Sequence, residues 1–151
     1  MNERYYTFDA TALPDGAYRL KVVASDAPSH NPGEALTTER VSDRFLIDTT
    51  PPVLSAIDAH MQNGKIHVTL TATDNATPIG HAEYSVDAGP WQYVEPVGKL
   101  SDSLTEHYDF EAPLKPQQPD AAPAANPSEH LITVRVYDRY ENAAAAKAVV
   151  R

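Results

Sequence analysis

Apolar and polar residues alternate with a period of two along much of the chain. The alternation is clearest at residues 66–72 and 132–136, where Ile, Val, Leu or Ala lies at every second position. Successive side chains of a strand point to opposite faces of a sheet, so the pattern predicts strands with one buried face. Turn-forming clusters separate the strands, among them residues 62–64 (QNG) and 87–90 (DAGP). The helix-favouring stretch 142–147 is too short to be stable alone, and we interpret it as the start of the last strand.

The segment from Asp48 to Pro52 divides the chain into two parts. Its two successive prolines, Pro51 and Pro52, are typical of a short, stiff polyproline spacer. Beyond it the pattern predicts seven or eight strands, at 53–59, 64–73, 81–87, 91–95, 98–102, 104–111, 130–138 and 143–150. Before it the pattern predicts three strands, at 5–12, 17–25 and 39–48. We therefore predict an all-β chain with a partial antiparallel unit at 1–50 and a complete antiparallel β-sandwich at 51–151.

An internal repeat supports this division. The segment Tyr6–Ala10 is similar to Tyr108–Ala112, and Tyr18–Asp26 is similar to His130–Asp138. The second pair of segments lies further apart because of a Pro- and Ala-rich insertion at 115–127 (KPQQPDAAPAANP). We expect this insertion to be a solvated loop that can be shortened at little cost in stability. Residues 1–50 would then correspond to the last three strands of the complete unit.

The complete part resembles bacterial immunoglobulin-like and fibronectin type III-like modules. The D-x-T-P-P junction at 48–52 is similar to junctions in tandem arrays of such modules. The segment around Leu13 and Tyr18 resembles the one that carries a tyrosine corner, and AEYSVDAGPW at 82–91 is similar to modules near the C-terminus of large bacterial envelope proteins. The resemblance implies a secreted or cell-envelope protein and a Tyr18 side chain bonded back to the backbone. Such motifs specify fold well and function poorly.

Composition excludes several classes of function. The 151 residues carry 12 Lys and Arg against 21 Asp and Glu, a formal net charge of −9. The basic residues form no stripe, which argues against nucleic acid and anionic membrane surfaces as partners. The chain has no Cys, which excludes disulfides and thiolate chemistry. No apolar run approaches the roughly 18 residues of a membrane span, so we expect no membrane insertion.

Catalytic motifs are missing from the sequence. The six His form no HExxH pair, and no Ser lies in a G-x-S-x-G context. We therefore expect no enzymatic activity. His67 and His81 are each expected on a strand, which leaves a cross-strand zinc site as an alternative to two solvated histidines.

Oxygen-bearing side chains at the strand ends are the best candidates for metal ligands. Asp138, Glu141 and Asn142 share one turn, Asp26 lies at the equivalent strand end of the first part, and Asp74 follows another strand. Oxygen ligands clustered in loops suit Ca²⁺. The spacing matches no known calcium loop, so we expect no cofactor and keep Ca²⁺ as the alternative. Without a metal, these side chains would cap turns by accepting bonds from backbone N–H groups.

Aromatic residues offer a candidate binding surface. Trp91 and Tyr93 are two positions apart and are predicted to share one face, with Tyr84 on the neighbouring strand. Such a platform can stack on sugar rings or anchor a protein partner. The alternative is that Trp91 closes one end of the core.

These observations favour a non-catalytic structural or spacer module within a longer extracellular or envelope protein. The alternative is an accessory module that binds carbohydrate or protein through Trp91, Tyr93 or the loop ends. The expected partners are neighbouring domains of the same polypeptide. A second copy of the chain is also expected to bind through residues 1–50, because a partial sandwich leaves an apolar face uncovered. That face is predicted to carry Tyr6, Phe8, Tyr18, Leu20, Val22, Phe45 and Ile47.

Overall fold

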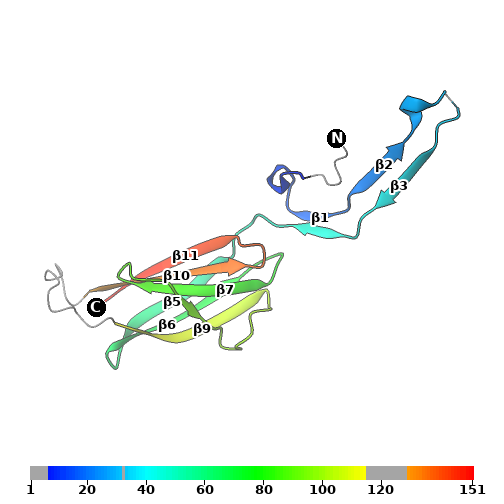
Figure 1. The fold of residues 1–151 in the computed structure, drawn as a ribbon. Coiled ribbons are helices and arrows are strands. Elements are labelled where there is room, and N and C mark those ends of the chain that lie inside the picture. Colours follow the sequence, from blue (N-terminus) through cyan, green and yellow to red (C-terminus); the bar gives the residue numbers. More distant parts are fainter. Residues whose placement is uncertain (1–6, 32, 115–128) are drawn as a thin grey trace. The chain divides into compact units, whose positions relative to one another are not determined.

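The computed structural model describes residues 7–31, 33–114 and 129–151. The chain divides into two compact units, Met1–Thr49 and Thr50–Arg151 (Figure 1). Both consist of antiparallel strands, so the chain is all-β as predicted. Two parts of the sequence-based prediction lie outside the described residues. They are the insertion at 115–127 and residues 5 and 6, which begin the predicted strand 5–12 and include Tyr6 of the predicted apolar face. Within the described ranges, no helix has both the length and the apolar character that a membrane crossing requires.

The second unit contains two antiparallel sheets that face each other, as Figure 1 shows. One sheet has the strand order β5-β6-β9 and the other β11-β10-β7-β8. The strands are β5 (Val53–Gln62), β6 (Lys65–Thr73), β7 (Ile79–Val86), β8 (Gln92–Val94), β9 (Thr105–Pro113), β10 (His130–Asp138) and β11 (Ala143–Val150). This arrangement agrees with the predicted antiparallel sandwich.

One predicted strand of this unit is wrong. Residues 98–102 form turns and irregular structure instead of a strand. Lys99 has a left-handed backbone (φ 60°), and its N–H donates to the Pro96 carbonyl at 2.8 Å. A left-handed residue closes a turn and does not continue a pleated strand.

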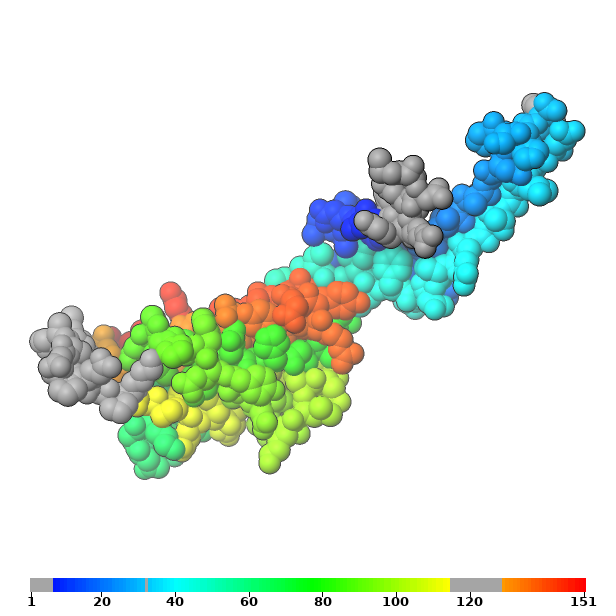
Figure 2. Space-filling view, in the orientation of Figure 1, coloured from blue at the N-terminus to red at the C-terminus, as the bar shows by residue number. Residues whose placement is uncertain are grey.

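The alternating apolar residues of both sheets form one closed core. Along β6 and β10 every second side chain is buried, and β7 and β9 contribute further residues. The buried members are Ile66, Val68, Leu70, Ala72, Ile79, Ala82, Tyr84, Val94, Tyr108, Ala112, Ile132, Val134, Val136 and Val150. The green and orange atoms of the paired strands β7 and β10 lie side by side in Figure 2. Burial of this apolar surface is the main stabilising contribution to the unit.

The outer faces of the sheets carry polar side chains that pair across strands. Lys65 pairs with Glu111, and His67 Nε2 lies 2.8 Å from Asp109 Oδ1 on the β6–β9 face. Thr71 Oγ1 and His107 Nδ1 extend the same row at 3.0 Å. Cross-strand pairs of this kind stabilise a sheet by tenths of a kcal/mol each, up to about 1 kcal/mol.

The first unit consists of two short antiparallel pairs. Strand β1 (Gly16–Tyr18) pairs with β4 (Phe45–Ile47), and β2 (Lys21–Ser25) pairs with β3 (Thr37–Val41). The predicted strands 17–25 and 39–48 are therefore each interrupted.

The interruption is a local irregularity in one antiparallel ladder. Two residues on one side, Arg19 and Leu20, lie opposite residues 42–44 on the other. Ser42 and Leu20 still bond, because the Ser42 N–H donates to the Leu20 carbonyl at 2.8 Å and the Leu20 N–H donates to Ser42 Oγ at 2.9 Å. An extra residue of this kind bends the ladder.

The predicted strand at 5–12 is also wrong over its described part. Residues Ala10–Ala12 form a short 3₁₀ helix, η1, and a second one, η2, spans Ala27–Ser29. The Asp9 carboxylate caps η1 by accepting the Thr11 N–H at 2.9 Å. Local side-chain capping thus competes with the extended conformation here.

Tyr18 links the start of the first unit to its sheet. Its hydroxyl donates to the Pro14 carbonyl at 2.6 Å, and its ring lies 6.2 Å from that of Phe45. This is the bond that the tyrosine-corner resemblance implies. Ile47, assigned by the sequence to an uncovered face, is buried, whereas Val22 and Val23 are exposed.

Candidate functional site

The three predicted aromatic site residues lie in different surroundings. Tyr93 belongs to β8 and is 62% exposed, while Trp91 precedes that strand and is 41% exposed. Tyr84 faces the core, and its hydroxyl donates to Gln92 Oε1 at 3.0 Å. Burial raises the pKa of Tyr84. Trp91 therefore does not close the core, and Tyr84 does not share an open platform with it.

Trp91 packs against a charged side chain. The Arg135 guanidinium carbon lies 4.1 Å from the centre of the Trp91 ring, and it lies 5.2 Å from the centre of the Tyr137 ring. Glu83 accepts hydrogen bonds from Arg135 Nε at 2.8 Å and from the Tyr137 hydroxyl at 3.1 Å. His81 stacks on Tyr137 with ring centres 4.4 Å apart. These five residues form a cluster on β7, on β10 and beside β8.

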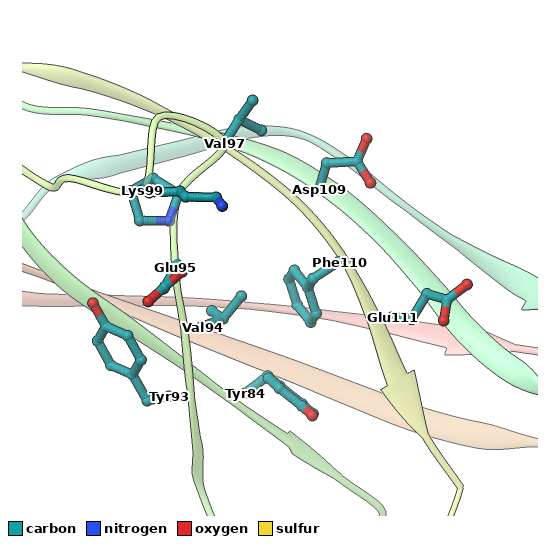
Figure 3. Close-up of a pocket in the computed structure, with 10 residues that line it drawn as sticks. Tyr84, Tyr93, Val94, Glu95, Val97, Lys99, Asp109, Phe110 and Glu111 are labelled. Carbon is teal, nitrogen blue, oxygen red and sulfur yellow. The ribbon is translucent and has the colours of Figure 1, made fainter.

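A pocket lies between the sheet edges β8 and β9. Its volume is about 540 Å³. Tyr84, Val94 and Phe110 gather on one side of it, whereas Asp109 and Glu111 point away from them (Figure 3). The pocket is lined by Tyr84, Tyr93, Val94, Glu95, Pro96, Val97, Lys99, Asp109, Phe110 and Glu111. Two of the three predicted binding residues, Tyr84 and Tyr93, thus meet in it.

The pocket combines an aromatic base with a charged rim. The rings of Tyr84 and Phe110 lie 5.0 Å apart. Glu111 forms an ion pair with Lys65 on β6, and Asp109 Oδ1 lies 2.8 Å from His67 Nε2 on the same strand. Aromatic surface beside carboxylates is suited to sugar rings, which present C–H faces and hydroxyl groups.

The structure does not support the alternative of a cross-strand zinc site at His67 and His81. His67 lies on β6 and His81 on β7, and these strands belong to different sheets. His67 instead lies against His60, with ring centres 5.1 Å apart.

Asp74 follows β6 and holds the loop that leads to β7. Its Oδ1 accepts the N–H groups of Ala76 and Thr77, each at 2.8 Å. The Asp74 side chain is almost fully buried, and its Oδ2 has no hydrogen-bond partner among the described residues. An unpaired carboxylate oxygen in a buried position is energetically costly.

Asp138 holds the turn between β10 and β11 in the same manner. Its Oδ1 accepts the N–H groups of Tyr140 at 2.7 Å and Asn142 at 2.9 Å, and its Oδ2 accepts Asn142 Nδ2 at 2.7 Å. These are the capping bonds that the sequence left as the alternative to metal ligation. Asp138 is fully buried.

Glu141 differs from Asp138, the buried predicted ligand of the same turn. It is exposed and left-handed, with φ 66°. Desolvation, the hydrogen bond to Glu83 and the nearby Glu141 charge raise the pKa of Tyr137, despite an opposing effect of Arg135.

The loop after β6 and the turn after β10 lie together at one end of the second unit. The Arg139 N–H donates to the Pro78 carbonyl at 3.0 Å and joins them. One carboxylate oxygen of Asp74 and one of Asp138 lie within 4.8 Å of each other. The sequence named both residues and did not show that they meet, because this proximity depends on the pairing of β7 with β10.

Arg135 is a further residue that sequence reasoning missed. In the alternating pattern of β10 it is simply a polar position, and only the register Arg135–Glu83 brings it beside Trp91.

Comparison with known proteins finds no matching family model, no matching curated protein and no matching solved structure.

Proposed function

We propose that this chain is a non-catalytic structural module of a longer extracellular or envelope protein. In this proposal the second unit is an immunoglobulin-like or fibronectin type III-like sandwich, and the first is part of a similar unit. Residues 48–52 are then a stiff junction between neighbouring modules of one polypeptide.

The carrying observation is the closed core of the second unit together with its paired outer surface. The apolar side chains of its core cluster are covered by its own two sheets. Many of the outward charges already have cross-strand partners, such as Lys65 with Glu111 and Arg135 with Glu83. A surface whose charges are already paired within the module leaves few of them to bind a ligand, which suits a spacer.

The strand order also supports the family resemblance. A sheet of β5-β6-β9 facing one of β11-β10-β7-β8 is an arrangement compatible with immunoglobulin-like sandwiches. The Tyr18 hydroxyl bond to Pro14 adds a second feature of this class.

Force spectroscopy of the chain between two handle domains tests the spacer role. A structural module should release the residues of the second unit in a single step. Fully extended residues span roughly 3.3–3.6 Å each, which fixes the expected gain in length. A gradual extension without a discrete step would contradict the proposal.

A second candidate function is carbohydrate binding at the β8 edge. The exposure of Tyr93 beside an aromatic pocket favours it. A glycan array tests it with the variant Tyr93→Ala and, as a matched control on the turn after β10, Tyr140→Ala. Binding that Tyr93→Ala removes and Tyr140→Ala keeps would support this function. The spacer proposal predicts no binding by any of the three proteins.

A further inference from the structure

We propose that Asp74 and Asp138 form a binding site for Ca²⁺ at one end of the second unit. The two side chains come from different loops, and one oxygen of each lies within 4.8 Å of the other. Their residues are 4% and 0% exposed. The inference stands independently of the spacer role, because it rests on the geometry of two side chains alone.

The unpaired oxygen of Asp74 points to a missing positive partner. Asp74 Oδ1 is fully used by the N–H groups of Ala76 and Thr77, while Oδ2 has no hydrogen-bond partner among the described residues. Buried polar atoms in proteins are nearly always paired with a protein group, water or an ion. A cation bound to the pair would therefore give its largest stabilisation at Asp74 Oδ2.

The negative charges of Asp74 and Asp138 also favour a cation at this position. Neither Asp74 nor Asp138 takes part in the ion pairs of the described residues. Two like charges held close together and away from water repel each other. A divalent cation between them replaces this repulsion by two attractions.

The chemistry of the donors selects the metal. Both ligands are carboxylate oxygens, which favour hard cations such as Ca²⁺ and Mg²⁺. Calcium–oxygen distances of about 2.3–2.6 Å allow two ligands of one ion to lie up to about 5 Å apart, whereas Mg²⁺ allows only about 4 Å. Two carboxylate oxygens within 4.8 Å of each other can both reach one Ca²⁺ ion. The remaining coordination positions would be filled by water or by further oxygen ligands.

The backbone around the pair is preorganised for such an ion. Both carboxylates are fixed by N–H groups of their own loops, and the bond from the Arg139 N–H to the Pro78 carbonyl fixes the loops to each other. Ligands that are already held in place lose little conformational entropy on binding.

The test is thermal unfolding of the full chain with EDTA and with excess CaCl₂. A ligand that binds only the folded state raises the midpoint, by about 10 °C or more at a hundredfold excess over Kd. The variant Asp74→Asn keeps the oxygen that caps Ala76 and Thr77 and removes the charge. It should lose the Ca²⁺ response and, in EDTA, melt at or above the temperature of the original chain. The control Asp58→Asn removes an exposed carboxylate from β5 and should respond to Ca²⁺ like the original chain.

The proposal is overturned if the original chain gains no stability from millimolar Ca²⁺, or if Asp74→Asn responds equally well. It is also overturned if Asp58→Asn loses the response as Asp74→Asn does. If Asp74→Asn does not fold, Ca²⁺ titration of the original chain by NMR decides. The amide signals of Ala76, Thr77, Tyr140 and Asn142 should then shift first, and shifts confined to other residues would reject the site. Mg²⁺ in a parallel titration should bind more weakly than Ca²⁺, and tighter Mg²⁺ binding would contradict the choice of metal.

Discussion

Single carboxylates hold three turns of the second unit in place. One oxygen each of Asp74, Glu106 and Asp138 accepts two backbone N–H groups, and all three residues are buried. Hydrogen bonds from N–H groups to a charged acceptor are stronger than neutral ones. The acidic residues at the strand ends therefore have a structural role whether or not a metal binds.

Ionisation of Tyr108 should lower the stability of the second unit. Tyr108 is the largest fully buried side chain, and burial raises its pKa to about 12. The fold therefore favours the neutral phenol. Because the unfolded chain loses this proton first, near pH 10, stability should be complete below pH 10 and fall as the pH rises to about 12. Two pKa units correspond to about 2–3 kcal/mol.

The variant Tyr108→Phe should remove most of this alkaline loss. Its stability at neutral pH should change by no more than about 1 kcal/mol, because the Tyr108 hydroxyl has no hydrogen-bond partner among the described residues. Urea unfolding at several pH values measures both effects. The control Tyr93→Phe alters an exposed phenol and should keep the alkaline loss. An unchanged pH profile in Tyr108→Phe would reject this explanation.

At the scale of elements, the start of β7 lies unusually close to the end of β10. A Cβ atom added at Gly80 would lie 2.8 Å from the Asp138 carbonyl oxygen and 3.1 Å from its carbon. Both are backbone atoms of a paired strand, so no side-chain rotation relieves the clash. This contact also keeps the loop of Asp74 near the turn of Asp138.

The variant Gly80→Ala should therefore lower the free energy of unfolding by about 1–3 kcal/mol. Gly98→Ala is the matched control, because its added Cβ would meet nothing closer than the Leu100 carbonyl oxygen at 3.9 Å. Chemical denaturation compares the two variants. Equal stabilities would show that the strands move apart at no cost.

The elements with the clearest local sequence pattern were predicted best. Strands β10 and β11 have the predicted bounds, because alternation defines β10 and the turn at 139–142 separates it from β11. The first unit was predicted less well, because the irregularity between Tyr18 and Lys21 interrupts strands whose alternation continues through it. The candidate sites depend on register and on loop contacts, which is why the Arg135–Trp91 and Asp74–Asp138 pairs required the structure.

At the scale of the whole molecule, the two units differ in how well they cover their apolar residues. In the first unit Leu20, Val22, Val23 and Val41 are exposed, and its strands pair only in twos. Exposed apolar surface and unpaired strand edges favour association with another chain.

We therefore expect the full chain to self-associate through residues 1–50. Light scattering at tens of micromolar should give a mass above that of the monomer, and residues 50–151 alone should be monomeric. A monomeric full chain would contradict this expectation. Equal association of the truncated chain would assign the interface to the second unit.

The central claim of this account is that residues 50–151 are a complete sandwich with its own core. The most direct measurement is the thermal unfolding of this segment alone, followed by circular dichroism. We expect one cooperative transition within a few degrees of the main transition of the full chain, because the segment contains every residue of the core cluster. A broad, non-cooperative melt, or the absence of folded signal, would contradict the claim.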